Sequence, residues 1–304
     1  MRIATLLPSA TEIVCALGLA EQVVGVSHEC DHPAAIAGRP VLTEPKLDPR
    51  GTSAAIDARV RALVRDGLSV YRIKEEALRA ARPDLIVTQE QCEVCAVSFS
   101  EVQQAARALL DTPATIVSLK PNRLDEVLDD FQRVADAAGV PEAGAQLIAA
   151  SRARLDTIAR RIRHARSRPR VACIEWLEPL MVAGNWVPEL VELGGGTYEF
   201  TAAGAHSPAL SWEALVASAP DVVIVMPCGF PLEQTRRELP QLTARPEWRA
   251  LPAVRNRRAY VVDGNAYLNR PGPRLVDSAE LLAGLIQPGH CAALIPAGSW
   301  ELIA

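Results

Sequence analysis

The stretches EALRAARPD (76–84) and EALVASAPD (213–221) are two copies of one nine-residue phrase. They agree at six of nine positions, and each leads into a short apolar run, LIVT (85–88) and VVIV (222–225). In each copy the proline predicts the end of a helix, and the apolar run is typical of a buried strand. A common helix–turn–strand pattern would explain the Pro-Asp pair, but not the glutamate at the same helix position in both copies. We therefore predict an internal duplication, with one copy in each half of the chain.

Strand and helix signals alternate along the first 120 residues, which is typical of α/β layers. The expected strands are 2–7, 22–27, 84–88 and 114–119. The expected helices are 54–64, 75–81, one that begins at Ser9, and one capped by Ser98 or Ser100. We predict that Ser9 caps the first helix, with Glu12 three residues later completing a capping box, and that Gly18 ends it.

The strand signal disappears between Asn122 and His164. Two helices are expected there, and the second begins at Pro141, whose fixed φ suits a first turn. Alternation then resumes, with strands expected at 170–176, 221–226 and 258–263, and helices at 186–195, after Ser211, and from Pro273 to Ile286. The segment 293–304 has no clear pattern.

Together these patterns predict an α/β protein made of two Rossmann-like lobes with mostly parallel sheets. The predicted lobes are residues 1–120 and 169–304, and a long helical spacer, residues 121–168, joins them.

Composition excludes several classes of function. The 304 residues have a net charge of −4 with both signs mixed along the chain, so there is no basic field for nucleic acid. No apolar run approaches the ~18–20 residues of a membrane span. The N-terminus lacks a signal-peptide pattern, so we expect a cytoplasmic protein as the sequence stands, or a periplasmic or membrane-associated one if the true start lies upstream. Seven cysteines, an odd number, fit free thiols in a reducing compartment.

A ligand site is expected at one edge of each sheet. In open parallel sheets, ligands bind beyond the carboxyl ends of the strands, and two lobes facing each other across such edges would form a ligand cleft. The loops that follow the expected strands supply the predicted ligand contacts, which are Ser9, Thr11, His28, Glu29, Gln89, Cys92, Cys95, Trp176, Trp186, Tyr267 and Arg270.

The chemistry of these contacts indicates the kind of ligand. Ser9 and the amides of its helix N-terminus could hold an anionic or amide-bearing edge, and Arg270 could hold a carboxylate or phosphate. Trp176, Trp186 and Tyr267 bring flat side chains that suit a planar or bulky organic ligand. Core or rim packing explains these aromatic residues about as well.

The loop TQEQCEVCAV (88–97) leaves three interpretations open. Cys92 and Cys95 are thiols lining a pocket, ligands of a metal or metallo-ligand, or a redox pair between a strand and a helix. A soft-metal site could combine them with His28 and Cys30. There is no second close cysteine pair, which a strong zinc signature needs.

Motifs for catalysis are absent from the sequence. It contains no G-x-S-x-G elbow, no P-loop and no H-E-x-x-H. We therefore expect a binding protein, not an enzyme, with no required cofactor.

Several stretches in a fixed order resemble the helical-backbone periplasmic binding proteins, which serve ABC importers for cobalamin, iron–siderophores and haem. They are LLPSATEIVCALGLAEQVVGVSHECDHP, EALRAARPDLIV, VAGNWVPELVELGGG, SWEALVASAPDVVIV and YLNRPGPRLVD, and the resemblance covers about residues 2–286. It is strongest to the cobalamin-binding branch. It implies two Rossmann-like lobes joined by one long helix, a corrinoid or metal chelate as ligand, and an ABC permease as partner.

In that family, one carboxylate on each lobe docks against arginines of the permease. The matching positions are Glu76 and Glu213, and solvated helix glutamates remain the alternative. Aromatic residues that stack on the corrin are replaced here, for example by Thr88 and Met181. The SHEC and QEQCEVC loops are instead rich in thiols and imidazole, which could reach an axial position of cobalt or iron. An alternative function is a cytosolic protein that reuses the fold for metal, thiol or corrinoid handling, with or without catalysis.

Overall fold

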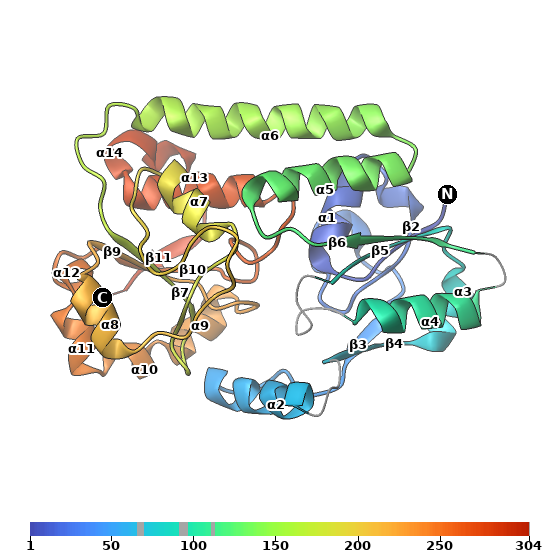
Figure 1. Cartoon of the computed structure of the whole chain (residues 1–304), viewed down its shortest axis with the longest axis horizontal. Helices are drawn as coiled ribbons and strands as arrows, with labels where there is room; N and C mark the ends of the chain where they lie inside the picture. The colour runs from blue at the N-terminus through green and yellow to red at the C-terminus, as the bar shows by residue number, and fades with distance from the viewer. Residues whose placement is uncertain (66–69, 91–96, 111–112, 304) are drawn as a thin grey trace. The chain divides into compact units, whose positions relative to one another are not determined.

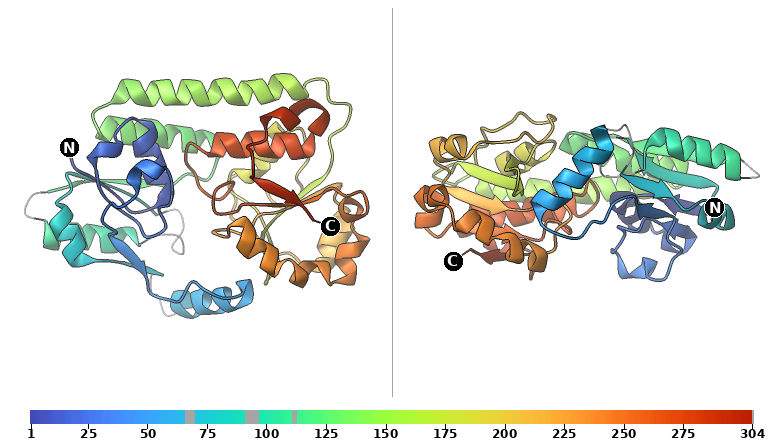
Figure 2. Two further views of the ribbon diagram at one scale, coloured as in Figure 1. Left: turned by 180° about the vertical axis from the view of Figure 1, so that it is seen from behind. Right: turned by 90° about the horizontal axis from the view of Figure 1, so that it is seen from below.

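The computed structural model describes residues 1–65, 70–90, 97–110 and 113–303, shown from three directions in Figures 1 and 2. The chain divides into two compact units. Unit 1 comprises Met1–Gly51, Ala55–Pro121 and Asp125–Ala150, and unit 2 comprises Thr52–Ala54, Asn122–Leu124 and Ser151–Ala304. The boundary at Ala150 falls inside the long helix α6 (Pro141–Ile162). The three-part division expected from the sequence stays a prediction.

Unit 1 is built on a four-stranded sheet in which every pair of neighbours is parallel. Its order is β2 (Val23–Val26), β1 (Ile3–Thr5), β5 (Leu85–Gln89) and β6 (Thr115–Leu119). Helices α1 (Pro8–Ala16) and α5 (Leu124–Ala137) lie on one side of the sheet, and α3 (Glu75–Ala81) and α4 (Phe99–Leu109) lie on the other (Figure 1). The remaining elements are η1 (Ala20–Gln22), η2 (Ala34–Ile36), α2 (Ser53–Arg65) and the antiparallel pair β3 (Thr43–Pro45) and β4 (Tyr71–Ile73).

Alternating strand residues form the core on the α3 and α4 side. Ala4, Leu6 and Ile86 point to this side and are buried against Leu78 of α3 and Val102 of α4. Ser98, one of the two predicted caps, is the N-cap of α4, since its hydroxyl accepts a hydrogen bond from the Glu101 amide.

Unit 2 is built on a five-stranded sheet of order β11-β10-β9-β7-β8. The central strands β10 (Ala259–Val262), β9 (Val222–Val225) and β7 (Val171–Trp176) are parallel, and the edge strands β11 (Trp300–Leu302) and β8 (Met181–Val182) are antiparallel to their neighbours. The helices are α7 (Val187–Leu193), α8 (Trp212–Ser218), α9 (Leu232–Glu238), α10 (Pro240–Thr243), α11 (Pro246–Ala250), α12 (Pro252–Arg255), α13 (Leu275–Ile286), α14 (Pro288–Cys291) and η3 (Ala292–Leu294). Two mostly parallel α/β sheets were predicted, and the structure confirms them.

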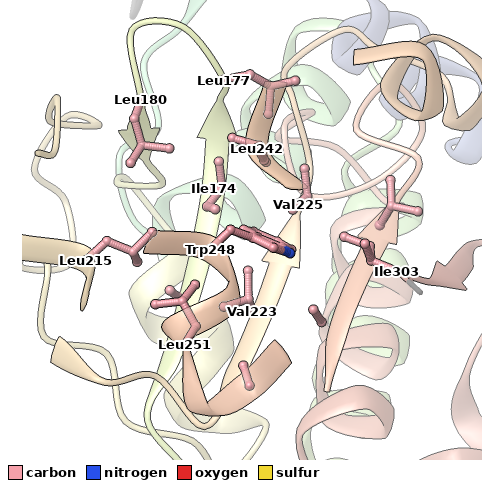
Figure 3. Packing of buried hydrophobic residues seen from close by; sticks show 14 of the residues in the cluster. Ile174, Leu177, Leu180, Leu215, Val223, Val225, Leu242, Trp248, Leu251 and Ile303 are labelled. Carbon is pink, nitrogen blue, oxygen red and sulfur yellow. The ribbon is translucent and has the colours of Figure 1, made fainter. Parts of the chain in front are cut away.

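Trp248 on α11 is central to the core of unit 2. It is 2% exposed, and Figure 3 shows its ring among Ile174, Val223 and Val225 of the sheet. Leu251 lies beside it in the same cluster. The short helices α9 to α12 cover this face of the sheet because they carry these apolar side chains.

The predicted capping role of Ser9 is wrong. Helix α1 begins at Pro8 and its N-cap is Leu7, with no side-chain cap. Proline has no N–H to satisfy and its φ is already helical, so it takes the first position of the helix and places Ser9 inside the first turn. Gly18, with φ +82°, lies two residues after the helix as a left-handed residue.

The duplicated phrase has the same backbone in both units. Helix α3 ends at Arg82 with φ 39° and ψ 60°, and α8 ends at Ala219 with φ 43° and ψ 59°. Both are left-handed residues without a glycine, six positions after Glu76 and Glu213 respectively. The next strand, β5 or β9, then enters the centre of the sheet. The predicted duplication is therefore present in the structure as a helix–turn–strand unit in each half.

The same hydrogen bonds anchor both copies to the first strand of their sheet. The amide of Arg2, before β1, donates to the Asp84 carboxylate at 2.7 Å, and the amide of Arg170, before β7, donates to Asp221 at 2.9 Å. The guanidinium of each arginine also donates to a main-chain carbonyl three residues before that aspartate. Because the aspartate immediately precedes the strand, this contact sets the register between the first strand and its neighbour.

We predict that glycine stabilises both turns. A left-handed conformation costs roughly 1–2 kcal/mol for a residue with a Cβ, so Arg82→Gly and Ala219→Gly should each raise the free energy of unfolding by up to about 1 kcal/mol. Ala217→Gly, at an exposed position inside α8, is the matched control and should lower it by about 1 kcal/mol. Urea denaturation measures all three. Destabilisation by the two turn variants would contradict the left-handed geometry.

Asp130 on α5 gives unit 1 a pH-dependent stability. Its side chain is 1% exposed, one oxygen lies 2.8 Å from the Arg133 guanidinium, and the other has no partner in the described part of the chain. Burial raises the pKa of this carboxyl to about 7; Arg133 opposes the increase, and Asp129 and Glu126 add to it. The folded protein therefore keeps a proton that the unfolded chain loses near pH 4.

It follows that stability falls as the pH rises from about 4 through 7. A change of one in pKa is worth about 1.4 kcal/mol, so ionisation of Asp130 costs the folded state up to about 4 kcal/mol at pH 8. We expect Asp130→Asn to remove most of the decrease in the free energy of unfolding with pH, measured by urea denaturation from pH 4 to 8. Asp129→Asn, at an exposed neighbour, should reduce this slope only slightly, because Asp129 raises the Asp130 pKa less than burial does. An equal slope in Asp130→Asn and the wild type would refute the assignment.

Candidate functional site

The carboxyl edge of the sheet in unit 1 has a topological switch point. The chain passes from β1 to β2 on one side and later to β5 and β6 on the other, so the loops after β1 and β5 diverge there. Ser9 lies just after β1, and Thr88 and Gln89 end β5. The hydroxyls of Ser9 and Thr88 are buried and have no hydrogen-bond partner within the described ranges. Thr88 was not among the predicted contacts: the family resemblance placed it where an aromatic residue stacks on the corrin, but no sequence signal marked its hydroxyl.

Thr11, on α1, has a hydroxyl that is bound inside unit 1. It is fully buried, and its hydroxyl lies 2.6 Å from the Thr5 hydroxyl and 3.0 Å from the Cys30 sulfur. It also donates to the Leu7 carbonyl at 3.3 Å. These contacts join α1, β1 and the loop after β2, and the ligand contact of Thr11 stays a prediction.

The loop after β2 carries a hydrogen-bonded chain of polar groups. The Thr43 hydroxyl donates to the Ser27 hydroxyl at 3.0 Å, and His28 Nδ1 lies 2.7 Å from the same Thr43 oxygen. On the other side of the ring, His28 Nε2 lies 3.2 Å from Glu29 Oε1. The ring of Tyr71 packs edge-on against His28 with 4.7 Å between centroids. The structure thus brings together the predicted contacts His28 and Glu29.

The predicted metal site is only partly within the described residues. Cys92 and Cys95 lie outside them, so the metal, redox and pocket-lining interpretations all stay predictions. Within the described ranges, no group of three or more His, Cys, Asp or Glu side chains is arranged to hold a metal ion. Cys30 is directed to Thr11, at 3.0 Å.

The carboxyl edge of the sheet in unit 2 carries the remaining predicted contacts. Trp176 ends β7 and packs edge-on against Phe230 at 5.2 Å between centroids. Trp186 is 4% exposed, and its indole nitrogen donates to the Leu268 carbonyl at 2.8 Å. That bond fixes the loop after β10, where Leu268 has a φ of 72°. The indole of Trp186 therefore supports the loop that holds Tyr267 and Arg270.

Arg270 and Tyr267 are the polar groups of this loop. Arg270 is 9% exposed and donates to the Asn265 side-chain oxygen at 2.6 Å. Burial raises the pKa of the Tyr267 phenol, so it stays protonated and can donate a hydrogen bond. The Asn269 amide closes the loop by donating to the carbonyls of Met226 and Gly264. A largely buried guanidinium and a neutral phenol suit an anionic or carbonyl-bearing ligand.

The two glutamates of the duplicated phrase are exposed in the first turns of their helices. Glu76 is the second residue of α3, and Glu213 is the second residue of α8. Hydrogen bonds from its own backbone amide and from the Ser211 hydroxyl lower the pKa of Glu213, so this carboxylate is ionised at neutral pH. Ser211 caps α8 by accepting from the Ala214 amide. Both repeats therefore present a carboxylate at an equivalent position of equivalent helices.

Among the helices of the described ranges, none is both long and apolar enough to cross a membrane.

Comparison with known proteins matches residues 3–266 to the family described as periplasmic binding protein. A "Vitamin B12-binding protein" of Vibrio cholerae is 24% identical, with 92% of this chain and 86% of that protein covered. An "ABC transporter substrate-binding lipoprotein" of Bacillus subtilis is 23% identical, with 94% and 80% covered. The crystal structure of a "Periplasmic Heme Binding Protein" from Pseudomonas aeruginosa has a TM-score of 0.70 at 22% identity, and covers 100% of this chain and 95% of that one.

Proposed function

The chain belongs to the periplasmic binding protein family, and we propose that it is the solute-binding protein of an ABC importer for a corrinoid or a metal chelate. The observation that carries this proposal is the near full-length match to proteins named for vitamin B12 binding, over 92% of this chain. The relative named as a substrate-binding lipoprotein of an ABC transporter supports the importer as partner. Binding without chemical conversion is the proposed activity.

The polar groups of unit 2 fit such a cargo. Corrinoids carry a phosphodiester and amides, and haem carries carboxylates, so each offers acceptors to cations and N–H or O–H donors. Arg270 supplies a largely buried charge, and Tyr267 supplies a protonated phenol. Charged hydrogen bonds of this kind contribute about 1.5–3 kcal/mol each. We propose that these two residues bind the anionic part of the cargo.

A second candidate function is supported by the cysteines. Within the described residues, Cys15, Cys30, Cys173, Cys228 and Cys291 are all free thiols. Free thiols are typical of a reducing compartment, which favours a cytosolic protein that uses this fold to handle a metal, a thiol or a corrinoid. Genes for a permease and an ATPase beside this one, with an upstream leader, would favour the importer. The cellular location stays a prediction.

We expect the reduced, metal-free protein to bind cyanocobalamin or haemin in calorimetry with a Kd of about 1 μM or tighter, near −8 kcal/mol. Arg270→Gln should weaken binding by roughly 10–100-fold, since a charged hydrogen bond is lost. Arg255→Gln, at an exposed position, is the matched control and should bind like the wild type. If the folded protein binds neither compound, the corrinoid and haem assignments are wrong.

We propose further that Glu76 and Glu213 dock against arginines of the permease. Each is exposed on its unit, and ion pairs at two separate points reinforce each other through effective concentration. Glu76→Gln and Glu213→Gln should each weaken binding to a reconstituted cobalamin permease–ATPase complex by at least about 10-fold, and the double variant should weaken it further. Cargo affinity should not change.

Glu75→Gln is the matched control for docking. Glu75 is an exposed neighbour in α3, and its counterpart in α8 is Trp212, so the repeat predicts no shared role for it. Wild-type docking by the double variant in surface plasmon resonance would remove the docking assignment without affecting the cargo assignment.

A further inference from the structure

We propose that His28 Nε2 and Glu29 Oε1 together bind a divalent metal ion as two neighbouring ligands of one coordination sphere. Both residues lie in unit 1, in the loop after β2. The inference goes beyond the proposed cargo, because it concerns a metal ion on its own and needs no corrinoid or haem.

The hydrogen-bond network fixes the tautomer of His28. Thr43 Oγ1 donates its one proton to the Ser27 hydroxyl at 3.0 Å. The same Thr43 oxygen accepts from the His28 amide at 3.1 Å and lies 2.7 Å from His28 Nδ1. With its own proton used, Thr43 can only accept from the ring, so Nδ1 carries the hydrogen. In the neutral imidazole, Nε2 is then the atom with the free lone pair.

That lone pair is buried and faces a carboxylate. The Nε2 atom of His28 is inaccessible to solvent and makes no hydrogen bond within the described ranges. Glu29 Oε1 lies 3.2 Å away. Two electron-pair donors at this distance repel each other unless a cation lies between them. Either a second ring proton or a metal ion can supply that positive charge.

The spacing fits a metal ion. Zinc binds imidazole nitrogen and carboxylate oxygen at about 2.0–2.2 Å with tetrahedral angles, and two such ligands of one ion are then roughly 3.2–3.5 Å apart. The Nε2 to Oε1 distance of 3.2 Å agrees with adjacent ligands on one ion. A ring nitrogen paired with a carboxylate oxygen suits zinc and the other late first-row divalent ions.

The surroundings of the pair resemble the outer shell of a metal site. Metal-bound histidines almost always donate their second N–H to a nearby acceptor, which sets the ring orientation. Thr43 provides this acceptor at Nδ1, and the Tyr71 hydroxyl donates towards Glu29 Oε1 at 3.5 Å. The ring of Tyr71 also packs edge-on against the imidazole. His28 and Glu29 are thus held in place before any ion arrives.

The geometry also separates a metal ion from a macrocyclic cargo. A corrin or porphyrin occupies the four equatorial positions of its metal and leaves two axial positions on opposite sides. His28 and Glu29, only 3.2 Å apart, cannot occupy opposite positions of one metal. The pair therefore fits an ion with two adjacent open positions, not the centre of a macrocycle.

Zinc binding by the metal-free, reduced full-length protein tests this inference without any cargo. Calorimetry of the wild type should show one zinc ion per chain at this site. His28→Asn keeps an N–H near Thr43 but removes Nε2, and Glu29→Gln keeps the shape but removes the charge. Each of these two variants removes a direct ligand and should weaken zinc binding by more than roughly 100-fold. Loss of a residue that only hydrogen-bonds to a ligand costs roughly 10–100-fold. Thr43→Val removes only the acceptor at His28 Nδ1 and should weaken zinc binding by roughly 10–100-fold.

His32→Asn and Glu21→Gln are matched controls, because both residues are exposed and neither is part of the network. They should bind zinc like the wild type. Cobalt(II) spectra separate this site from the thiols, since nitrogen and oxygen ligands give no intense thiolate charge-transfer band. Two outcomes overturn the inference. One is the absence of zinc binding by the wild type, which would leave only the direct contact between His28 and Glu29. The other is undiminished binding by His28→Asn and Glu29→Gln.

Discussion

The contact on which both units depend is the one between the residue before the first strand and the aspartate that precedes the neighbouring strand. In unit 1 the Arg2 amide binds Asp84, and in unit 2 the Arg170 amide binds Asp221. A strand shifted by one residue would turn every side chain to the opposite face of the sheet, so a contact that fixes register also fixes which side chains enter the core on each side. The left-handed turn before each aspartate makes this contact possible without a glycine. The amino end of each sheet is thereby fixed, and the opposite end is free to carry loops.

Those loops differ between the units in how their polar groups are satisfied. In unit 1, Ser9 and Thr88 have buried hydroxyls without partners inside the described ranges, although unsatisfied polar groups are costly. In unit 2, Arg270 and Asn269 are bound to neighbouring acceptors. Hydrogen-bonding capacity is therefore unused at the edge of unit 1, whereas the loop after β10 in unit 2 is held by its own hydrogen bonds. A ligand that hydrogen-bonds to the Ser9 and Thr88 hydroxyls would recover the free energy that their unsatisfied burial costs.

The fold was predictable to a large extent because its signals are local. The α3 helix at Glu75–Ala81 and the caps Ser98 and Ser211 follow from residues close together in the sequence. The capping role of Ser9 was assigned wrongly because a serine that favours the N-cap directly follows a proline that favours the first helical position. The helix begins at Pro8. The strand β11 was missed because WEL is short and its pairing depends on β10, about forty residues earlier. Proline at the first position of α10, α11 and α12 is the signal that could have found those helices.

The candidate site was less predictable because its chemistry depends on contacts between distant residues. His28 could be placed in a loop from the sequence, but the atom it uses depends on Thr43, fifteen residues away, and on the proton that Thr43 gives to Ser27. A change of donor direction at Thr43 would exchange the roles of the two ring nitrogens and turn an N–H towards Glu29. In the proposed site, the ring atom that faces Glu29 is therefore set by a single hydroxyl proton. For the same reason, a histidine in a similar loop of a related chain carries no metal assignment until the acceptor at its other nitrogen is known.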